Sequence, residues 1–123
     1  MPHSSIVEIV SKNPFLLSNV CQYRNHCNIK LHEKKIIGVS LFTPPHRVNG
    51  NDTMTIRWNV TDGCTDCLTW TPQQMSFNGQ NFNDVQNLTF FRRKQSTSIS
   101  LSPIFVGGGF EMVSTETNGI SFI

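Results

Sequence analysis

Apolar and polar residues alternate with a period of two along much of this chain. In residues 53–60, TMTIRWNV, the side chains of Met54, Ile56 and Trp58 share one face, while threonine, arginine and asparagine occupy the other. Shorter alternating runs occupy residues 6–10, 27–31, 36–42, 74–77 and 87–90. One apolar face per run is typical of strands that cover a core on one side and meet water on the other. We therefore expect Met54, Ile56 and Trp58 to lie in the core of a sheet protein.

Turn-forming residues separate these runs. They gather at 48–52 (VNGND), 61–66 (TDGCTD), 78–80 (NGQ), 107–109 (GGG) and 118–119 (NG). The resulting strand spacing, roughly 8–12 residues, is typical of a sandwich or barrel. No segment carries an apolar stripe at the helical period, so the pattern predicts an all-β fold with little helix.

Residues 71–90, TPQQMSFNGQNFNDVQNLTF, hold eight Asn or Gln side chains. Alternation predicts a short strand that ends at Phe77 and another that contains Leu88 and Phe90, joined by a turn at Asn78-Gly79. Phe82 lies between the strands and is expected to fold back onto the core with these phenylalanines. Uncharged amides suit such a turn, because they bond to backbone groups that the turn leaves unpaired without a charge to desolvate.

Composition supports a sheet protein and narrows the possible partners. The chain has 123 residues, enough for one domain, and it lacks alanine, the best helix former. Its net charge of +2 does not favour nucleic acid as a partner. We expect the basic run at 92–94 to be a solvated strand end. No stretch reaches membrane-spanning length, so membrane insertion is not expected.

A family resemblance rests on the order of motifs along residues 27–123. The run at 71–90 is similar to a motif of extracellular immunoglobulin-like and Calx-beta-like repeats, with Pro72, a strand that ends in Phe77, and an Asn-aromatic-Asn at 81–83. The flanking runs IKLHEKKIIGVSLFTPP, DTMTIRWNVTDG, IFVGGGFEMV and GISFI resemble the other strands of that family in order and spacing. The family's aromatic is usually Trp, where this chain has Phe82.

The resemblance implies an immunoglobulin-like antiparallel β-sandwich over residues 27–123, preceded by an N-terminal extension, residues 1–26, with one apolar strand. It also implies a link in a chain of modules on a cell surface or in a secreted fibre. Calx-beta modules often bind calcium through clustered carboxylates, but the aspartates here are scattered, so no metal site is expected. The start, MPHSSIVEIV, shows no signal peptide, and we expect the chain to be a mature piece or a segment of a longer protein.

The four cysteines are the sharpest chemical feature: Cys21, Cys27, Cys64 and Cys67. A four-thiolate zinc site is one interpretation, which would make the chain a zinc-stabilised binding domain. An even cysteine count in a surface-type sandwich favours two disulfides, for which four cysteines allow three connectivities. We expect Cys21 to pair with Cys27 and Cys64 with Cys67, because each pair brackets a polar loop.

Possible modification and catalytic sites are few. Asn51, Asn59 and Asn87 each begin an Asn-x-Ser/Thr sequon, a candidate for N-glycosylation in a secreted protein. The histidines are dispersed, and nucleophile elbows, phosphate loops and paired carboxylates are absent from the sequence. We therefore expect neither an enzyme nor a bound cofactor.

The sequence thus predicts a non-catalytic structural or adhesive module of an extracellular, cell-surface or filament protein. Its expected partners are neighbouring copies or modules of the same protein, with glycans as a further candidate. A carbohydrate-binding, lectin-like module is the alternative, in which Trp58, Trp70, Tyr23 or Phe91 would stack on sugar rings. The strand in residues 6–10 is expected to complete its own sheet or to join that of a neighbouring molecule.

Overall fold

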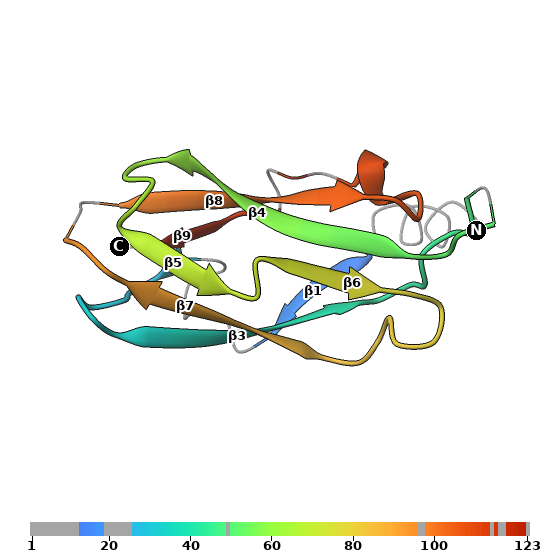
Figure 1. Ribbon diagram of the computed structural model, residues 1–123, viewed down its shortest axis with the longest axis horizontal. Coiled ribbons are helices and arrows are strands. Elements are labelled where there is room, and N and C mark those ends of the chain that lie inside the picture. The colour runs from blue at the N-terminus through green and yellow to red at the C-terminus, as the bar shows by residue number, and fades with distance from the viewer. Residues whose placement is uncertain are drawn as a thin grey trace, which may run out of the picture.

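Strands form almost all the regular structure of the chain. The computed structural model describes residues 13–18, 26–48, 50–95, 98–113, 115 and 118–122. The elements are β1 (Phe15–Ser18), β2 (His26–Cys27), β3 (Lys34–Leu41), β4 (Met54–Asp62), β5 (Leu68–Thr71), β6 (Gln74–Phe77), β7 (Gln86–Arg92), β8 (Ile99–Val106), the 3₁₀ helix η1 (Phe110–Met112) and β9 (Ile120–Phe122). They form two layered sheets (Figure 1), which confirms the predicted immunoglobulin-like β-sandwich.

The consecutive strands β5 and β6 belong to different sheets. The four-stranded sheet has the order β1-β3-β7-β5, and the five-stranded sheet has the order β2-β9-β8-β4-β6. The pairs are antiparallel except for β2 with β9, which is parallel. The chain passes from one sheet to the other at Pro72 and Gln73, where the Thr71–Pro72 peptide bond is cis. Strands β5 and β6 therefore run end to end along one side of the sandwich (Figure 1).

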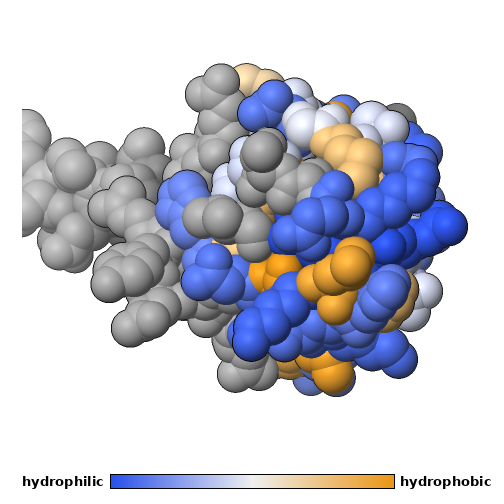
Figure 2. All heavy atoms as spheres, turned by 90° about the vertical axis from the view of Figure 1, so that its left-hand side faces the viewer, coloured by the Kyte–Doolittle hydropathy of each residue, from blue (hydrophilic) through white to orange (hydrophobic). Residues whose placement is uncertain are grey.

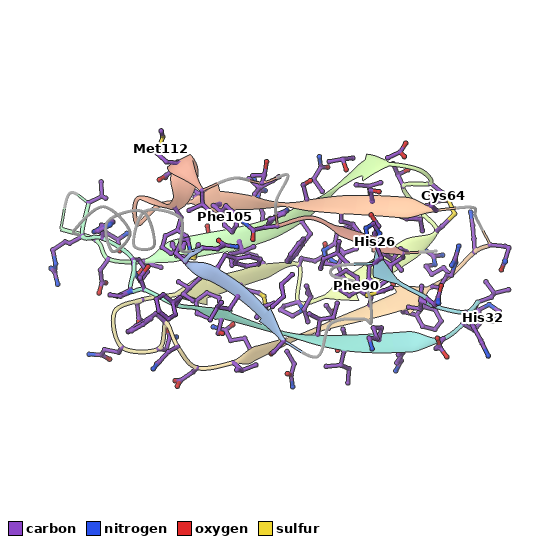
Figure 3. The ribbon with its side chains drawn as sticks, turned by 180° about the vertical axis from the view of Figure 1, so that it is seen from behind. His26, His32, Cys64, Phe90, Phe105 and Met112 are labelled. Atoms are coloured by element: carbon purple, nitrogen blue, oxygen red, sulfur yellow. A yellow bond between two sulfur atoms is a disulfide. The ribbon has the colours of Figure 1, made fainter. Side chains whose placement is uncertain are left out.

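The core lies between the sheets, where alternate side chains of each strand point inward. Ile56 of β4 is paired with Phe105 of β8, and the rings of Phe90 and Phe122 approach to 4.8 Å between centroids. Phe90 and Phe105 both lie between the layers in Figure 3. The residues that the sequence predicted as core lie as follows: Met54, Ile56, Phe77, Leu88 and Phe90 are fully buried, Trp58 is 6% exposed, and Phe82 is half-buried against the core.

The N-terminal region contributes an edge strand to the sandwich. Strand β1 pairs with β3, and Phe15 opposite Leu41 is buried. The Phe15 ring packs 5.1 Å from Phe105 and 6.1 Å from Trp58, measured between centroids. Part of the predicted extension therefore joins the sheet of its own chain. The apolar strand predicted at residues 6–10 lies outside the described residues.

Two local predictions were wrong. The strand predicted at 27–31 ends after Cys27, because the chain turns at Lys30–Glu33, where the Glu33 amide donates to the Lys30 carbonyl at 3.0 Å and His32 has a φ of 63°. Arg92, expected in a solvated strand end, is 2% exposed. It continues the inward alternation of β7, and its Nη1 donates to the Ile29 carbonyl oxygen at 2.7 Å.

Candidate functional site

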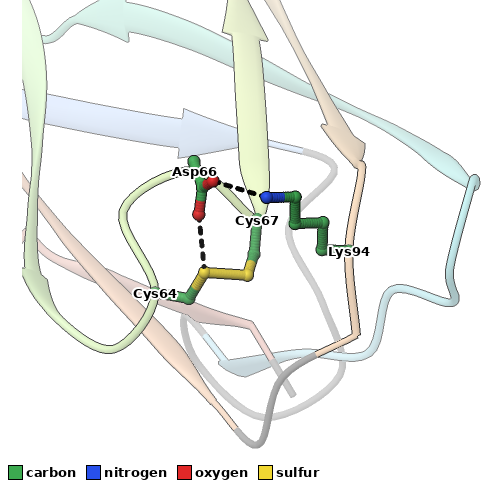
Figure 4. Close-up of polar contacts among 4 residues, drawn as sticks. All are labelled: Cys64, Asp66, Cys67 and Lys94. Atoms are coloured by element: carbon green, nitrogen blue, oxygen red, sulfur yellow. Dashed lines mark hydrogen bonds and ion pairs between the residues drawn. A yellow bond between two sulfur atoms is a disulfide. The ribbon is translucent and has the colours of Figure 1, made fainter.

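The turn between β4 and β5 holds the chemically distinctive residues. Cys64 and Cys67 form a disulfide with an S–S distance of 1.97 Å, which is the local pairing that we expected. The Asp66 carboxylate between them lies 2.6 Å from Lys94 Nζ and 3.1 Å from Cys64 Sγ (Figure 4). This end of the molecule carries mainly hydrophilic side chains, with separate hydrophobic ones among them (Figure 2). The turn is a covalently closed polar loop.

Cys27, at the end of β2, is also disulfide-bonded and fully buried. Its expected partner, Cys21, lies outside the described residues. Within the described residues, the one group of metal-ligating atoms is Cys64, Asp66 and Cys67, which lie within 4.8 Å of one another. A disulfide sulfur is not a thiolate, so this group does not fit the four-thiolate zinc hypothesis.

Two surface carboxyl groups have shifted pKa values. The hydrogen bond from Lys94, and then its positive charge, lowers the pKa of Asp66. The backbone amide of Gly107 donates to Glu111 Oε2 at 2.5 Å and lowers the pKa of that carboxyl group. Both shifts favour the ionised form. A general acid needs the opposite shift, so neither group has the environment of a catalytic proton donor.

The amide-rich segment uses its side chains on backbone groups. Asn78 Oδ1 accepts from the amides of residues 80 and 81, at 2.8 and 3.0 Å, and Asn81 Oδ1 accepts from the Asn78 amide at 2.7 Å. Gln73 Nε2 donates to the Trp70 carbonyl at 2.5 Å, and Gln86 Nε2 donates to the Ser76 carbonyl at 2.8 Å. These last bonds cap carbonyls of β5 and β6, the strands at the edges of the two sheets. The amides therefore close the turn and block exposed edges.

The sequon asparagines all lie on the surface. Asn51 is in the short turn closed by the bridge between Val48 and Asn51, Asn59 is on the outer face of β4, and Asn87 is on the outer face of β7. All are exposed. Asn59 and Asn87 thus lie on opposite outer faces of the sandwich, where a glycan would project into solvent from either sheet.

The outer face of the five-stranded sheet is hollowed on both sides of Asn59. One hollow of about 440 Å³ is lined mainly by residues of β4, β8 and η1: Asn59, Thr61, Ser102, Pro103, Ile104, Phe105, Glu111 and Thr115. A second, of about 380 Å³, is lined by Arg57, Trp58, Asn59, Gln73, Gln74 and Ile104. The hollows share Asn59 and Ile104, so they adjoin. Their amides and hydroxyls lie beside the apolar residues Pro103, Ile104 and Phe105, an arrangement that suits a neutral ligand with both polar and apolar faces.

The sequence did not predict this hollowed face. It placed Arg57 and Asn59 on the wet side of their strand, which is correct, because both are exposed. Ser102 and Ile104 lie opposite them on β8, and Glu111 follows on η1, so the hollows depend on which strands become neighbours. The sequence signal for this face was limited to the outward polar residues of 53–60.

The aromatic residues considered as sugar platforms are mostly unsuited to that role. Trp58 is in the core, and Trp70 is half-buried against it, with its ring 6.2 Å from that of Phe90. Phe91 is partly covered by His32, which stacks on it at 6.2 Å between centroids. Tyr23 lies outside the described residues. A sugar would have to be held mainly by polar groups.

This fold and surface define an immunoglobulin-like sandwich module, and solved structures of the same fold are known. WR4, an MSP family member of C. elegans, matches with a TM-score of 0.60 and 5% identity over 91% of this chain and 98% of its own. SSP-19, an MSP-domain protein like family member in Caenorhabditis elegans, matches with a TM-score of 0.50 and 5% identity over 80% of this chain and 92% of its own. No family model and no curated protein matches the sequence. At this identity the likeness supports the sandwich fold, and the resemblance to Calx-beta-like repeats stays a prediction.

Proposed function

We propose that this chain is a non-catalytic structural or adhesive module of an extracellular, cell-surface or filament protein. The observation that carries the proposal is the state of its cysteines: Cys27, Cys64 and Cys67 are all disulfide-bonded. Disulfides persist in oxidising compartments and are rare in the cytosol. Exposed sequons on both sheets are consistent with passage through an oxidising secretory compartment.

The non-catalytic part of the proposal draws on the carboxyl groups. The pKa shifts found among the described residues hold Asp66 and Glu111 ionised, and each carboxylate is engaged by a cation or a backbone amide. The paired, oppositely shifted groups of an acid–base site are not present there. No helix among the described residues is long and apolar enough to cross a membrane. We expect the partners to be neighbouring copies or modules of the same protein.

The test is the redox state and assembly of the natural protein. Protein from its native source should give a non-reduced digest with Cys64 linked to Cys67 and no alkylated thiol. The purified chain should also self-associate as its concentration rises, measured by sedimentation velocity. Alkylation of all four cysteines without reduction would refute the extracellular assignment. A chain that stays monomeric at all concentrations would refute binding to copies of itself.

A second candidate function is binding of a neutral carbohydrate, which the adjoining hollows at Asn59 favour. Binding should then depend on Arg57 and Gln74, which line one hollow. Arg57→Ala and Gln74→Ala should each abolish retention on a glycan array, whereas Lys34→Ala on the other sheet should not. Equal retention of all these variants would assign any sugar binding to another surface.

A further inference from the structure

The outer face of the four-stranded sheet carries several exposed apolar side chains. Four apolar side chains on this face or at its ends are strongly exposed: Leu16 (42%), Ile36 (52%), Phe42 (44%) and Val85 (58%). Single exposed apolar residues need no explanation, but a group on one sheet face is characteristic of a covered surface. One of the sequon asparagines lies within this group.

Asn87 lies among these residues. On β7 it is opposite Gly38 of β3, and the neighbouring pair on the same face is Thr89 with Ile36. A Cβ built on Gly38 would overlap the side chains of Ser18 and Val85, so Val85 leans over this glycine next to Asn87. Ile36 is the diagonal cross-strand neighbour of Asn87, a separation of about 7–8 Å in antiparallel sheets. Asn87 therefore has two aliphatic side chains, Ile36 and Val85, as neighbours on this face, together with the polar Thr89.

We propose that Asn87 carries an N-linked glycan whose first sugar residues lie on Ile36 and Val85 and cover this face. The inference rests on the proposed passage through a secretory compartment. The Asn87 Nδ2 forms a bond to the anomeric carbon of the sugar. The bond from that carbon to a pyrophosphate-linked lipid donor breaks, the lipid pyrophosphate leaves with the bonding electrons, and one amide proton is released.

The geometry suits the first sugar in two ways. Asn87 and Thr89, the ends of the sequon, are separated by one residue on a strand, so both side chains emerge on the same outer face. A pyranose ring presents C–H groups on one of its faces, and these can remove aliphatic side chains from water while the hydroxyls stay solvated. The glycan thus covers apolar side chains on the outer face and is not part of the core between the sheets.

Asn59 provides the matched comparison. It is also an exposed sequon asparagine on a strand, and its diagonal neighbour on β8, Ile104, is 38% exposed, whereas Arg57 and Ser102 beside it are polar. Sugar at Asn59 therefore covers less exposed apolar surface than sugar at Asn87, which lies beside both Ile36 (52%) and Val85 (58%). Loss of the two glycans should therefore have different effects on the same molecule.

The experiment uses the full chain secreted from a eukaryotic cell, with occupancy mapped by mass spectrometry. Asn87→Gln and Thr89→Ala remove the same glycan by different substitutions, and Asn59→Gln is the control. We expect Asn87→Gln and Thr89→Ala to raise binding of a hydrophobic dye several-fold and to promote self-association, and Asn59→Gln to change both by much less. Trimming the parent to one N-acetylglucosamine per site should leave dye binding low. Asn87→Gln combined with Ile36→Ser should restore low dye binding.

Two results would overturn the inference while the proposed function stands. One is an unmodified Asn87 in material that carries sugar at Asn51 or Asn59. The other is a modified Asn87 whose loss leaves dye binding equal to that of Asn59→Gln. Free cysteines together with no sugar at any sequon would overturn the secretory assignment itself, and the inference with it.

Discussion

The turns on either side of the β5–β6 segment are closed by different chemistry. Before β5, residues 63–67 are held by the Cys64–Cys67 disulfide and by the ion pair between Asp66 and Lys94. After β6, the described residues 78–84 have no disulfide and no ion pair, and the one carboxylate bond found there is from the Gly79 amide to Asp52 Oδ2 at 3.1 Å. Asn78 and Asn81 instead bond to backbone amides of the turn, and the Phe82 carbonyl accepts from the Leu41 amide at 2.7 Å.

The two kinds of bond make the two turns sensitive to different solution conditions. The cysteine turn depends on an oxidising environment and on an ionised carboxylate, so redox state and pH act on it. An amide neither titrates in the usual range nor reacts with thiols, so the bonds that Asn78 and Asn81 make in the second turn should persist when both change. The abundance of Asn and Gln in residues 71–90 is therefore explained by hydrogen bonds from uncharged side chains to the backbone, which a change of pH does not break.

The largest expected effect comes from the core that both turns share. Trp58→Ala should lower the free energy of unfolding by about 3–5 kcal/mol, because it leaves a cavity beside Phe15. Chemical denaturation, followed by far-UV circular dichroism, measures this loss. Since the two turns rest on one core, amide exchange should rise in both together.

Trp58→Phe is the matched control for that substitution. Trp58 Nε1 is buried and has no hydrogen-bond partner among the described residues, so phenylalanine removes an unpaired donor while it keeps an aromatic ring. It should cost clearly less than alanine. A loss below about 1 kcal/mol for Trp58→Ala would contradict the core assignment.

Removal of the disulfide should separate the two turns. In the chain-entropy model a bridge across so short a loop contributes about 2 kcal/mol, so Cys64→Ala with Cys67→Ala should lower the unfolding free energy by that amount. Amide exchange should rise in residues 63–67 and stay unchanged in 78–84. Equal increases in both turns would show that the bridge stabilises the whole sandwich.

The sequence predicted those parts of the fold that depend on local alternation. The inward face of β4 is an example, because Met54 and Ile56 are each flanked by polar residues and needed no knowledge of their neighbours. Burial of Arg92 was not predictable in this way. Its polarity indicated solvent, and the acceptor that permits burial, the Ile29 carbonyl, is distant in sequence. The hollows beside Asn59 likewise require the adjacency of β4 and β8.

A smaller effect should follow from a change in the amide turn. Asn78 Oδ1 accepts two backbone amides, so Asn78→Ala should lower the unfolding free energy by about 1 kcal/mol and raise amide exchange at residues 80 and 81. Asn78→Asp keeps the acceptor and adds a charge. It should be nearly as stable as the parent at neutral pH and weaken in acid, because the acceptor of the amides at residues 80 and 81 would then be a carboxylate. A stable Asn78→Ala variant would show that water replaces the side chain without cost.

The smallest effect concerns pH and the ion pair of the cysteine turn. Lys94 lowers the pKa of Asp66 in the folded protein, so the pair stabilises the fold fully above the ordinary pKa of an aspartate. That contribution is lost as the pH falls through the lowered folded value, where the carboxylate takes up a proton. Both side chains are well exposed, so the effect should be slight and should shrink further in high salt. Asp66→Asn should therefore lower the melting temperature a little at neutral pH and leave it unchanged in strong acid. Asp84→Asn is the control in the amide turn, since Asp84 makes no ion pair within the described residues. If Asp84→Asn flattened the pH profile as much as Asp66→Asn, the distinction between a charge-closed and an amide-closed turn would be wrong.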